Sequence, residues 1–88
     1  MPRYAVRLHP SAQRAFAKFE VSVQRRLSAA LDALAEDPRP PGSKRLVTDQ
    51  DLWRVRVGAY RIVYTIEDDQ LLILVVKPGP RRDVYRVL

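Results

Sequence analysis

The sequence predicts an α+β fold with an N-terminal strand, a two-helix hairpin and then an antiparallel β meander, with the helices on one sheet face. The first half carries apolar residues at helical spacing, up to a loop rich in proline at residues 37–43. The second half alternates apolar and polar residues or is apolar throughout, as strands do. Neither half has enough apolar residues to fold alone, so residues 1–88 are expected to form a single domain.

The first predicted elements are a strand and a helix. Residues 3–8, RYAVRL, alternate in polarity and predict a short strand. Pro10 and Ser11 then open a helix, because proline is tolerated in a first turn. One apolar stripe of this helix consists of Ala12, Ala15, Phe16 and Phe19.

A second helix follows, with Ser22 as its expected N-cap. Pro38 ends it near Asp37, because the residue before a proline avoids the helical region. Its buried side consists of Val23, Leu27, Ala30, Leu31 and Leu34. Its solvent side carries Arg25, Arg26, Asp32 and Glu36.

The rest of the chain predicts strands. Gly58 and Ala59 suit a two-residue turn with glycine first. Residues 67–70, EDDQ, make the next turn, and LLILVVK at 71–77 is apolar on both faces, as in a central strand. The predicted strands are 44–47, 52–57, 60–66, 71–77 and a last short one in RRDVYRVL.

The hairpin places arginines together. With the turn at Gly58 and Ala59, one apolar face toward the helices is formed by Trp53, Val55, Val57, Tyr60, Ile62 and Tyr64. Arg56 then lies opposite Arg61 on the other face, beside Arg54. Like charges opposite each other destabilise a sheet, so the pattern indicates an anion site, since guanidinium suits phosphate. The alternative is a solubilising surface in which Arg61 pairs with Glu67 or Asp83.

The tail adds chemistry to this face. Gly79, between two prolines, suggests a rigid bend that aims Arg81. Tyr85 has three open interpretations: stacking on a base, acid–base chemistry, or closing the sheet edge.

Composition narrows the class of partner. The net charge of +6 and pI of about 10.3 fit an anionic partner, either nucleic acid or an acidic protein. There is no cysteine and only one histidine, His9, so no metal site is expected. No apolar run approaches a membrane span and no signal peptide begins the chain, which predicts a cytoplasmic protein.

These stretches resemble the RelE/ParE superfamily of bacterial toxins from type II toxin–antitoxin systems, over nearly the whole chain. The most specific part is LWRVRVGAYRIVY, then EDDQ, LLILVVK and GPRRDVYR. The basic residues at both alternating strand positions and the arginine and tyrosine of the tail are more similar to RelE than to ParE. The resemblance implies a RelE-like fold of microbial-ribonuclease type.

The resemblance also implies an activity: metal-independent, cofactor-free cleavage of messenger RNA in the ribosomal A site, by attack of the RNA 2′-hydroxyl. By residue match, the implied catalytic residues are Arg54, Arg56, Arg61, Arg81 and Tyr85. Further RNA-binding residues are expected to be Lys44, Arg45, Arg82 and Arg86. The implied protein partner is an antitoxin with an acidic amphipathic segment.

Two departures from the family leave the chemistry open. Arginine replaces the lysine common at positions 54 and 56 and cannot act as a base, which leaves Tyr85 as a candidate. Pro80 stands where many relatives have histidine. A ParE-like inhibitor of DNA gyrase and a catalytically weak, antitoxin-binding module are the alternative functions.

Overall fold

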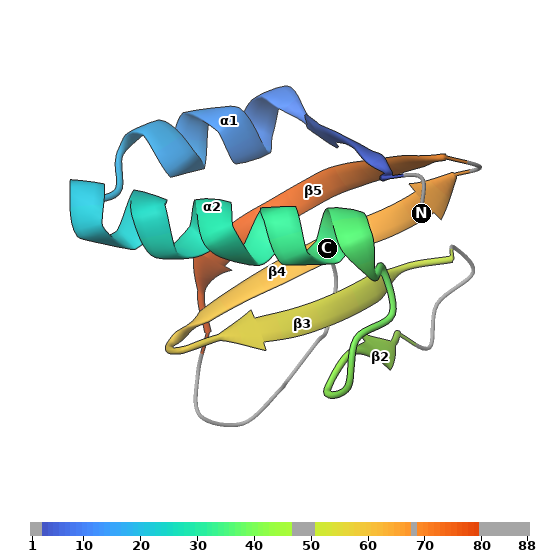
Figure 1. Ribbon diagram of the computed structural model, residues 1–88. Coiled ribbons are helices and arrows are strands. Elements are labelled where there is room, and N and C mark those ends of the chain that lie inside the picture. The colour runs from blue at the N-terminus through green and yellow to red at the C-terminus, as the bar shows by residue number, and fades with distance from the viewer. Residues whose placement is uncertain (1–2, 47–50, 68, 80–88) are drawn as a thin grey trace.

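The computed structural model describes residues 3–46, 51–67 and 69–79 of the chain (Figure 1). Both helices lie on one face of a five-stranded sheet, so the predicted α+β arrangement is confirmed. The elements in chain order are β1 (Ala5–Leu8), α1 (Pro10–Ala17), α2 (Val21–Glu36), β2 (Lys44–Arg45), β3 (Trp53–Val57), β4 (Tyr60–Glu67) and β5 (Gln70–Pro78).

The sheet joins the first strand to the last described one. Its order is β1-β5-β4-β3-β2, and β2 to β5 pair antiparallel, as the meander predicts. β1 pairs parallel to β5, with Val6 opposite Leu71. β5 therefore has a neighbour on each side over Gln70–Ile73. Its apolar residues belong to clusters on both faces of the sheet, which explains why its sequence does not alternate.

The second helix begins earlier than predicted. Glu20, not Ser22, is the N-cap residue of α2, and its carbonyl accepts the Gln24 N–H at 2.9 Å. No side chain caps this end. The Gln24 side chain instead donates to the Phe16 carbonyl at 3.0 Å, which ties α2 to the end of α1. This contact joins the two helices close to the start of α2.

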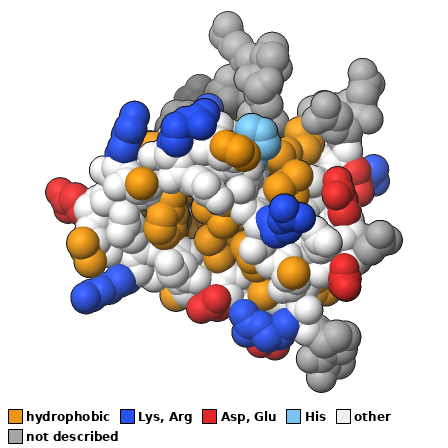
Figure 2. Space-filling view, turned by 90° about the horizontal axis from the view of Figure 1, so that it is seen from above, with side chains coloured by type: hydrophobic (Ala, Val, Ile, Leu, Met, Phe, Trp, Pro, Cys, Tyr) orange, Lys and Arg blue, Asp and Glu red, His pale blue; other side chains and the backbone are white. Residues whose placement is uncertain are grey.

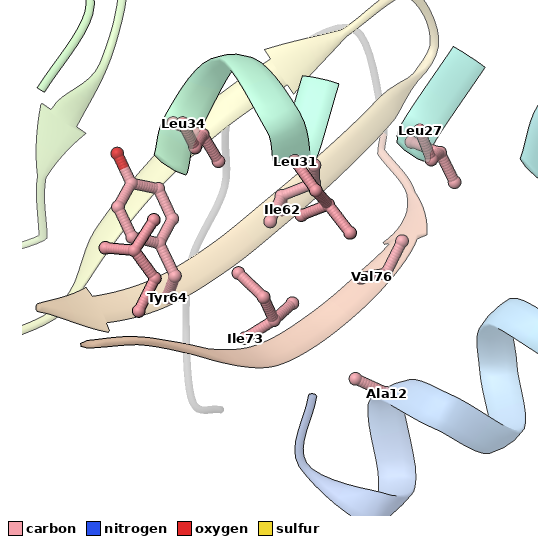
Figure 3. Close-up of a cluster of buried hydrophobic side chains, with 9 residues drawn as sticks. Ala12, Leu27, Leu31, Leu34, Ile62, Tyr64, Ile73 and Val76 are labelled. Atoms are coloured by element: carbon pink, nitrogen blue, oxygen red, sulfur yellow. The ribbon is translucent and has the colours of Figure 1, made fainter. Parts of the chain in front are cut away.

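The main core lies between the helices and the sheet. Leu27, Leu31 and Leu34 of α2 point onto β4 and β5, where they meet a layer that includes Ile62 and Tyr64 (Figure 3). The predicted apolar hairpin face is confirmed, since all six of its residues belong to this core or pack against it. Phe19, just beyond α1, adds an edge-to-face contact with Tyr60 at 5.0 Å between ring centroids.

A second, smaller cluster lies on the face of the sheet away from the helices. Leu46, Leu52 and Val63 are buried there, with Leu74 and Val75 packed against them. The sequence predicts a partly open face on this side of the sheet. The apolar cluster makes one end of the face part of the core.

The proline-rich loop after α2 is held against the sheet. The buried Tyr64 hydroxyl donates to the Pro38 carbonyl at 2.7 Å. Burial raises the pKa of Tyr64 from 10.0 to about 12, so it remains a neutral donor. Arg39 lies 5.2 Å above the Trp53 ring, a cation–π contact from the same loop.

The Tyr64 hydroxyl can be tested by removing it. Tyr64→Phe should lower the free energy of unfolding by about 1–3 kcal/mol, because the buried Pro38 carbonyl loses its donor. Since the folded-state pKa is raised, the contribution of Tyr64 to stability is complete below pH 10.0 and is lost as the pH rises through about 12. Urea unfolding across this window should show an alkaline loss in the wild type that is smaller in the variant. An equal loss in both proteins would contradict the assignment.

Trp53 provides a matched pair of substitutions in the core. Trp53→Ala should cost roughly 3–5 kcal/mol, because a large aromatic side chain is lost. The Trp53 indole nitrogen is buried without a hydrogen-bond partner, so Trp53→Phe keeps a ring, removes an unsatisfied donor and should cost much less. Thermal unfolding of both variants measures the difference, and equal losses would show that ring packing is not the cause.

Candidate functional site

The turn between β3 and β4 sets the geometry of the site. Gly58 has a φ of +60°, which glycine adopts at little cost. From this turn Val57 pairs with Tyr60, and the ladder continues to Trp53 opposite Tyr64, which confirms the predicted register. Because side chains alternate along a strand, the hairpin arginines lie on the face away from the helices.

Three cations form a row across the three central strands, at the end of the sheet next to the hairpin turn. Arg56 of β3 lies opposite Arg61 of β4, and Arg61 lies opposite Lys77 of β5. Side chains opposite each other in antiparallel strands have Cβ atoms about 4.5–5.5 Å apart. The row therefore concentrates positive charge on a narrow strip of the sheet.

A second pair of cations lies next to this row. Lys44 of β2 is opposite Arg54 of β3, and Arg54 is opposite Val63 of β4. Together with the row, this pair makes one surface, here called the cation face: Lys44, Arg54, Arg56, Arg61 and Lys77.

The cations of this face differ sharply in exposure. Arg54 is 5% exposed and Arg61 only 1%, whereas Lys44, Arg56 and Lys77 are exposed. Each of the three arginines interacts with other groups of the protein, and for the buried Arg54 and Arg61 such interactions offset the loss of water. The sequence predicts an exposed cluster of arginines. In the structure, the side chains of Arg54 and Arg61 are buried instead. An incoming anion would first meet the three exposed cations.

Gly79 lies against the Arg61 side chain, where a larger residue would collide with it. A Cβ atom on Gly79 would lie 3.0 Å from Cζ and Nε of Arg61 and 3.1 Å from its Nη2. The Gly79 N–H donates to the Ala59 carbonyl at 2.9 Å, which fixes the glycine backbone beside the hairpin turn. Among the described residues, Gly79 therefore leaves space for the guanidinium group of Arg61. The sequence predicts that Gly79 positions Arg81, but Arg81 lies outside the described residues.

A β-bulge brings Lys77 to the cation face, which the sequence does not predict. Val63 pairs with Val75 but Tyr64 pairs with Ile73, so β5 has one extra residue, Leu74. Regular pairing from the Glu67 turn would put Lys77 on the helix side. The strand is apolar on both faces, so its alternation carries no signal of the shift.

The structure does not bring all the predicted site residues together. Arg45 pairs with Trp53, so it projects from the other face of the sheet, and its guanidinium binds Asp51 at 3.0 Å. Glu67 cannot pair with Arg61 as the alternative interpretation supposes, because it lies six positions further along β4, about 20 Å away. The predicted residues Arg81, Arg82, Asp83, Tyr85 and Arg86, and the last predicted strand, lie outside the described residues.

The described tyrosines are structural. Tyr4, Tyr60 and Tyr64 all pack in the core under the helices. Within residues 3–46, 51–67 and 69–79, no three His, Asp or Glu side chains gather as they would around a metal ion. Neither helix of this part of the chain has the length and apolar character to cross a membrane. The chemistry of the described site is that of clustered cations.

Comparisons with known proteins identify the family and the fold of the chain. Residues 6–85 match the family model of the ParE toxin of type II toxin–antitoxin system, parDE. An Escherichia coli protein described as a RelE-like toxin is 31% identical, over 97% of this chain and 93% of its own.

Two solved structures have the same fold. One is the archaeal RelE–RelB complex from Pyrococcus horikoshii, with a TM-score of 0.78 and 30% identity over 91% of this chain and 99% of that one. The other is the toxin–antitoxin complex RelBE2 from Mycobacterium tuberculosis, with a TM-score of 0.79 and 26% identity over 89% and 93%.

The contact between Gly79 and Arg61 can be measured by a double-mutant cycle. Gly79→Ala should lower the free energy of unfolding by about 1–3 kcal/mol, because it overpacks a buried guanidinium. In an Arg61→Lys background, which lacks the planar head, the same substitution should cost less. Urea unfolding of the four proteins gives the coupling energy.

Gly42 is the control for this cycle. Its φ is +92° with open space around the Cβ position, so Gly42→Ala should cost about 1–2 kcal/mol from backbone strain alone. This cost should be the same with Arg61 and with Lys at position 61. If Gly79→Ala also costs the same stability with Arg61 and with Lys at position 61, the proposed contact between Gly79 and Arg61 is ruled out.

Proposed function

The chain belongs to the RelE/ParE superfamily of toxins from type II toxin–antitoxin systems, and we propose that it is a ribosome-dependent endoribonuclease. Its proposed substrate is messenger RNA in the ribosomal A site. The observation that carries this proposal is the register of the hairpin, which sets Arg56 opposite Arg61 beside Arg54 and Lys44. Such a concentration of cations on one sheet face suits a polyanion.

The proposed reaction is a transesterification within the RNA. The 2′-oxygen attacks the adjacent phosphorus and the bond from phosphorus to the 5′-oxygen breaks, giving a 2′,3′-cyclic phosphate and a 5′-hydroxyl. Negative charge grows on the phosphoryl oxygens, and guanidinium groups placed beforehand stabilise it. Burial of Arg54 and Arg61 supports such placement, because enclosed side chains keep their positions.

Proton transfer needs a residue other than these arginines, because a guanidinium group offers hydrogen-bond donors and no acceptor. We assign this role to Tyr85, with Arg81 as a further phosphate ligand, from their match to the tail of RelE-like toxins. The three described tyrosines are packed in the core and do not compete for the role.

The proposed protein partner is an antitoxin with an acidic amphipathic segment, met in the cytoplasm. The Pyrococcus horikoshii and Mycobacterium tuberculosis relatives were both solved as complexes with antitoxins. From above, hydrophobic side chains gather in the middle of the molecule and most charged ones lie toward the margins (Figure 2). An amphipathic segment could match both zones, and the net charge of +6 favours an acidic one.

A second candidate function is inhibition of DNA gyrase. It is favoured by the family model, which is that of a ParE toxin. The two functions differ in a direct way, because a gyrase inhibitor leaves messages intact and blocks supercoiling by the purified enzyme.

The first experiment is induced expression in a bacterial host with primer extension along a translated message. The wild type should produce cuts in phase with codons. Arg56→Ala and Arg81→Ala should each reduce cleavage by about 10²–10³-fold, the usual effect of one lost transition-state donor. Arg56 is the better test on the sheet, because it is exposed whereas Arg61 is the largest fully buried side chain.

Arg25 is the matched control. It is exposed on α2, in the helix layer, so Arg25→Ala removes one charge outside the cation face and should leave cleavage unchanged. Growth arrest with intact messages would refute the ribonuclease, and loss of supercoiling in a gyrase assay would then establish the second candidate.

A further inference from the structure

Lys77 occupies an unusual place in the sheet. It is the one charged residue of β5, a strand otherwise composed of apolar residues, Gln70 and Pro78. The bulge at Leu74 turns it to the face away from the helices, where it lies directly opposite Arg61. It is exposed, as is Arg56, which lies opposite Arg61 from the other side.

A structural role for Lys77 has to be separated from a binding role. Lysine often protects an edge strand from pairing with another chain, and β1 pairs only with Gln70–Ile73, so among the described strands Lys77 has β4 alone beside it in the sheet. Lysine also pairs with a carboxylate across a sheet, but here the neighbour is a cation. The salt bridges among the described residues join Arg3 to Asp32 and Glu36, and Arg45 to Asp51.

We propose that Lys77 is an RNA-binding residue of the cation face, which holds a substrate phosphate over Arg61 together with Arg56. The two exposed cations flank the buried guanidinium, each one strand away, about 4.7–4.9 Å. An anion above Arg61 is therefore within reach of both flexible side chains. This inference rests on the proposed action on RNA. It adds Lys77 of β5 to the phosphate-binding residues, beside the arginines of β3.

Stability separates this role from a structural one. Lys77→Gln removes a like charge opposite Arg61, so the melting temperature should stay the same or rise. A lysine that holds the fold together would give the opposite shift. Lys77→Arg keeps the charge and should behave as the wild type in every measurement.

Binding is measured with a short single-stranded RNA over a range of salt concentrations. Lys77→Gln should weaken binding about tenfold at low salt, as expected for one charged hydrogen bond. The slope of log K against log salt should fall by about 0.7, the value for one phosphate contact on a single strand. Lys18→Gln, an exposed lysine at the end of α1, removes the same charge from the helix layer and should change neither quantity.

Cleavage on ribosomes programmed with message is the second measurement. Lys77→Gln should lower kcat/KM by about tenfold, mainly through KM, because it loses binding that is common to substrate and transition state. If Lys77→Gln matches Lys18→Gln in both RNA affinity and kcat/KM, the inference is wrong, even if the wild type cleaves. If Lys77→Gln loses the phosphate contact while the wild type cuts no message, the ribonuclease proposal fails and the inference stands. A wild type that neither binds nor cuts RNA overturns both.

Discussion

The two-residue turn at Gly58 and Ala59 is the constraint on which both the core and the cation face depend. A shift of one residue would turn every side chain of a strand to the other face. Arg54 and Arg56 would then face α2, and Trp53 and Val55 would face solvent. Packing of the helices onto the hairpin therefore fixes the position of the arginines. The residues that stabilise the fold and those that carry charge alternate along the same two strands, so neither set can move alone.

Burying the charged groups of the cation face lowers the stability of this small domain. A chain of 88 residues has a modest stability margin, and enclosing two guanidinium groups requires internal partners and close packing. Two backbone features allow it. Gly79 leaves space for the head of Arg61, and the bulge at Leu74 makes β5 present Lys77 rather than an apolar side chain. Fixed charge on a rigid sheet is the arrangement that electrostatic catalysis requires.

Local patterns in the sequence predict much of this fold and only part of its site. The hairpin register follows from alternation and turn chemistry, which act over a few residues, and the arginines follow from the register. Two features that escape prediction depend on contacts between strands, the parallel pairing of β1 with β5 and the bulge that reorients Lys77. A third is the start of α2, where Glu20 rather than Ser22 is the N-cap residue. Burial of Arg54 and Arg61 also escapes, since alternation predicts the face of a side chain but not what surrounds it.

The pairing of β1 with β5 has a consequence for biosynthesis. The two strands are the first and the last described, and Val6 meets a partner made 65 residues later. Contacts of such high sequence separation form slowly and only after the intervening chain is available. All strands that build the cation face lie between residues 44 and 78. A nascent chain whose strand β5 is still inside the ribosomal exit tunnel therefore lacks the assembled face, and the charged surface forms only after residues 44–78 have emerged.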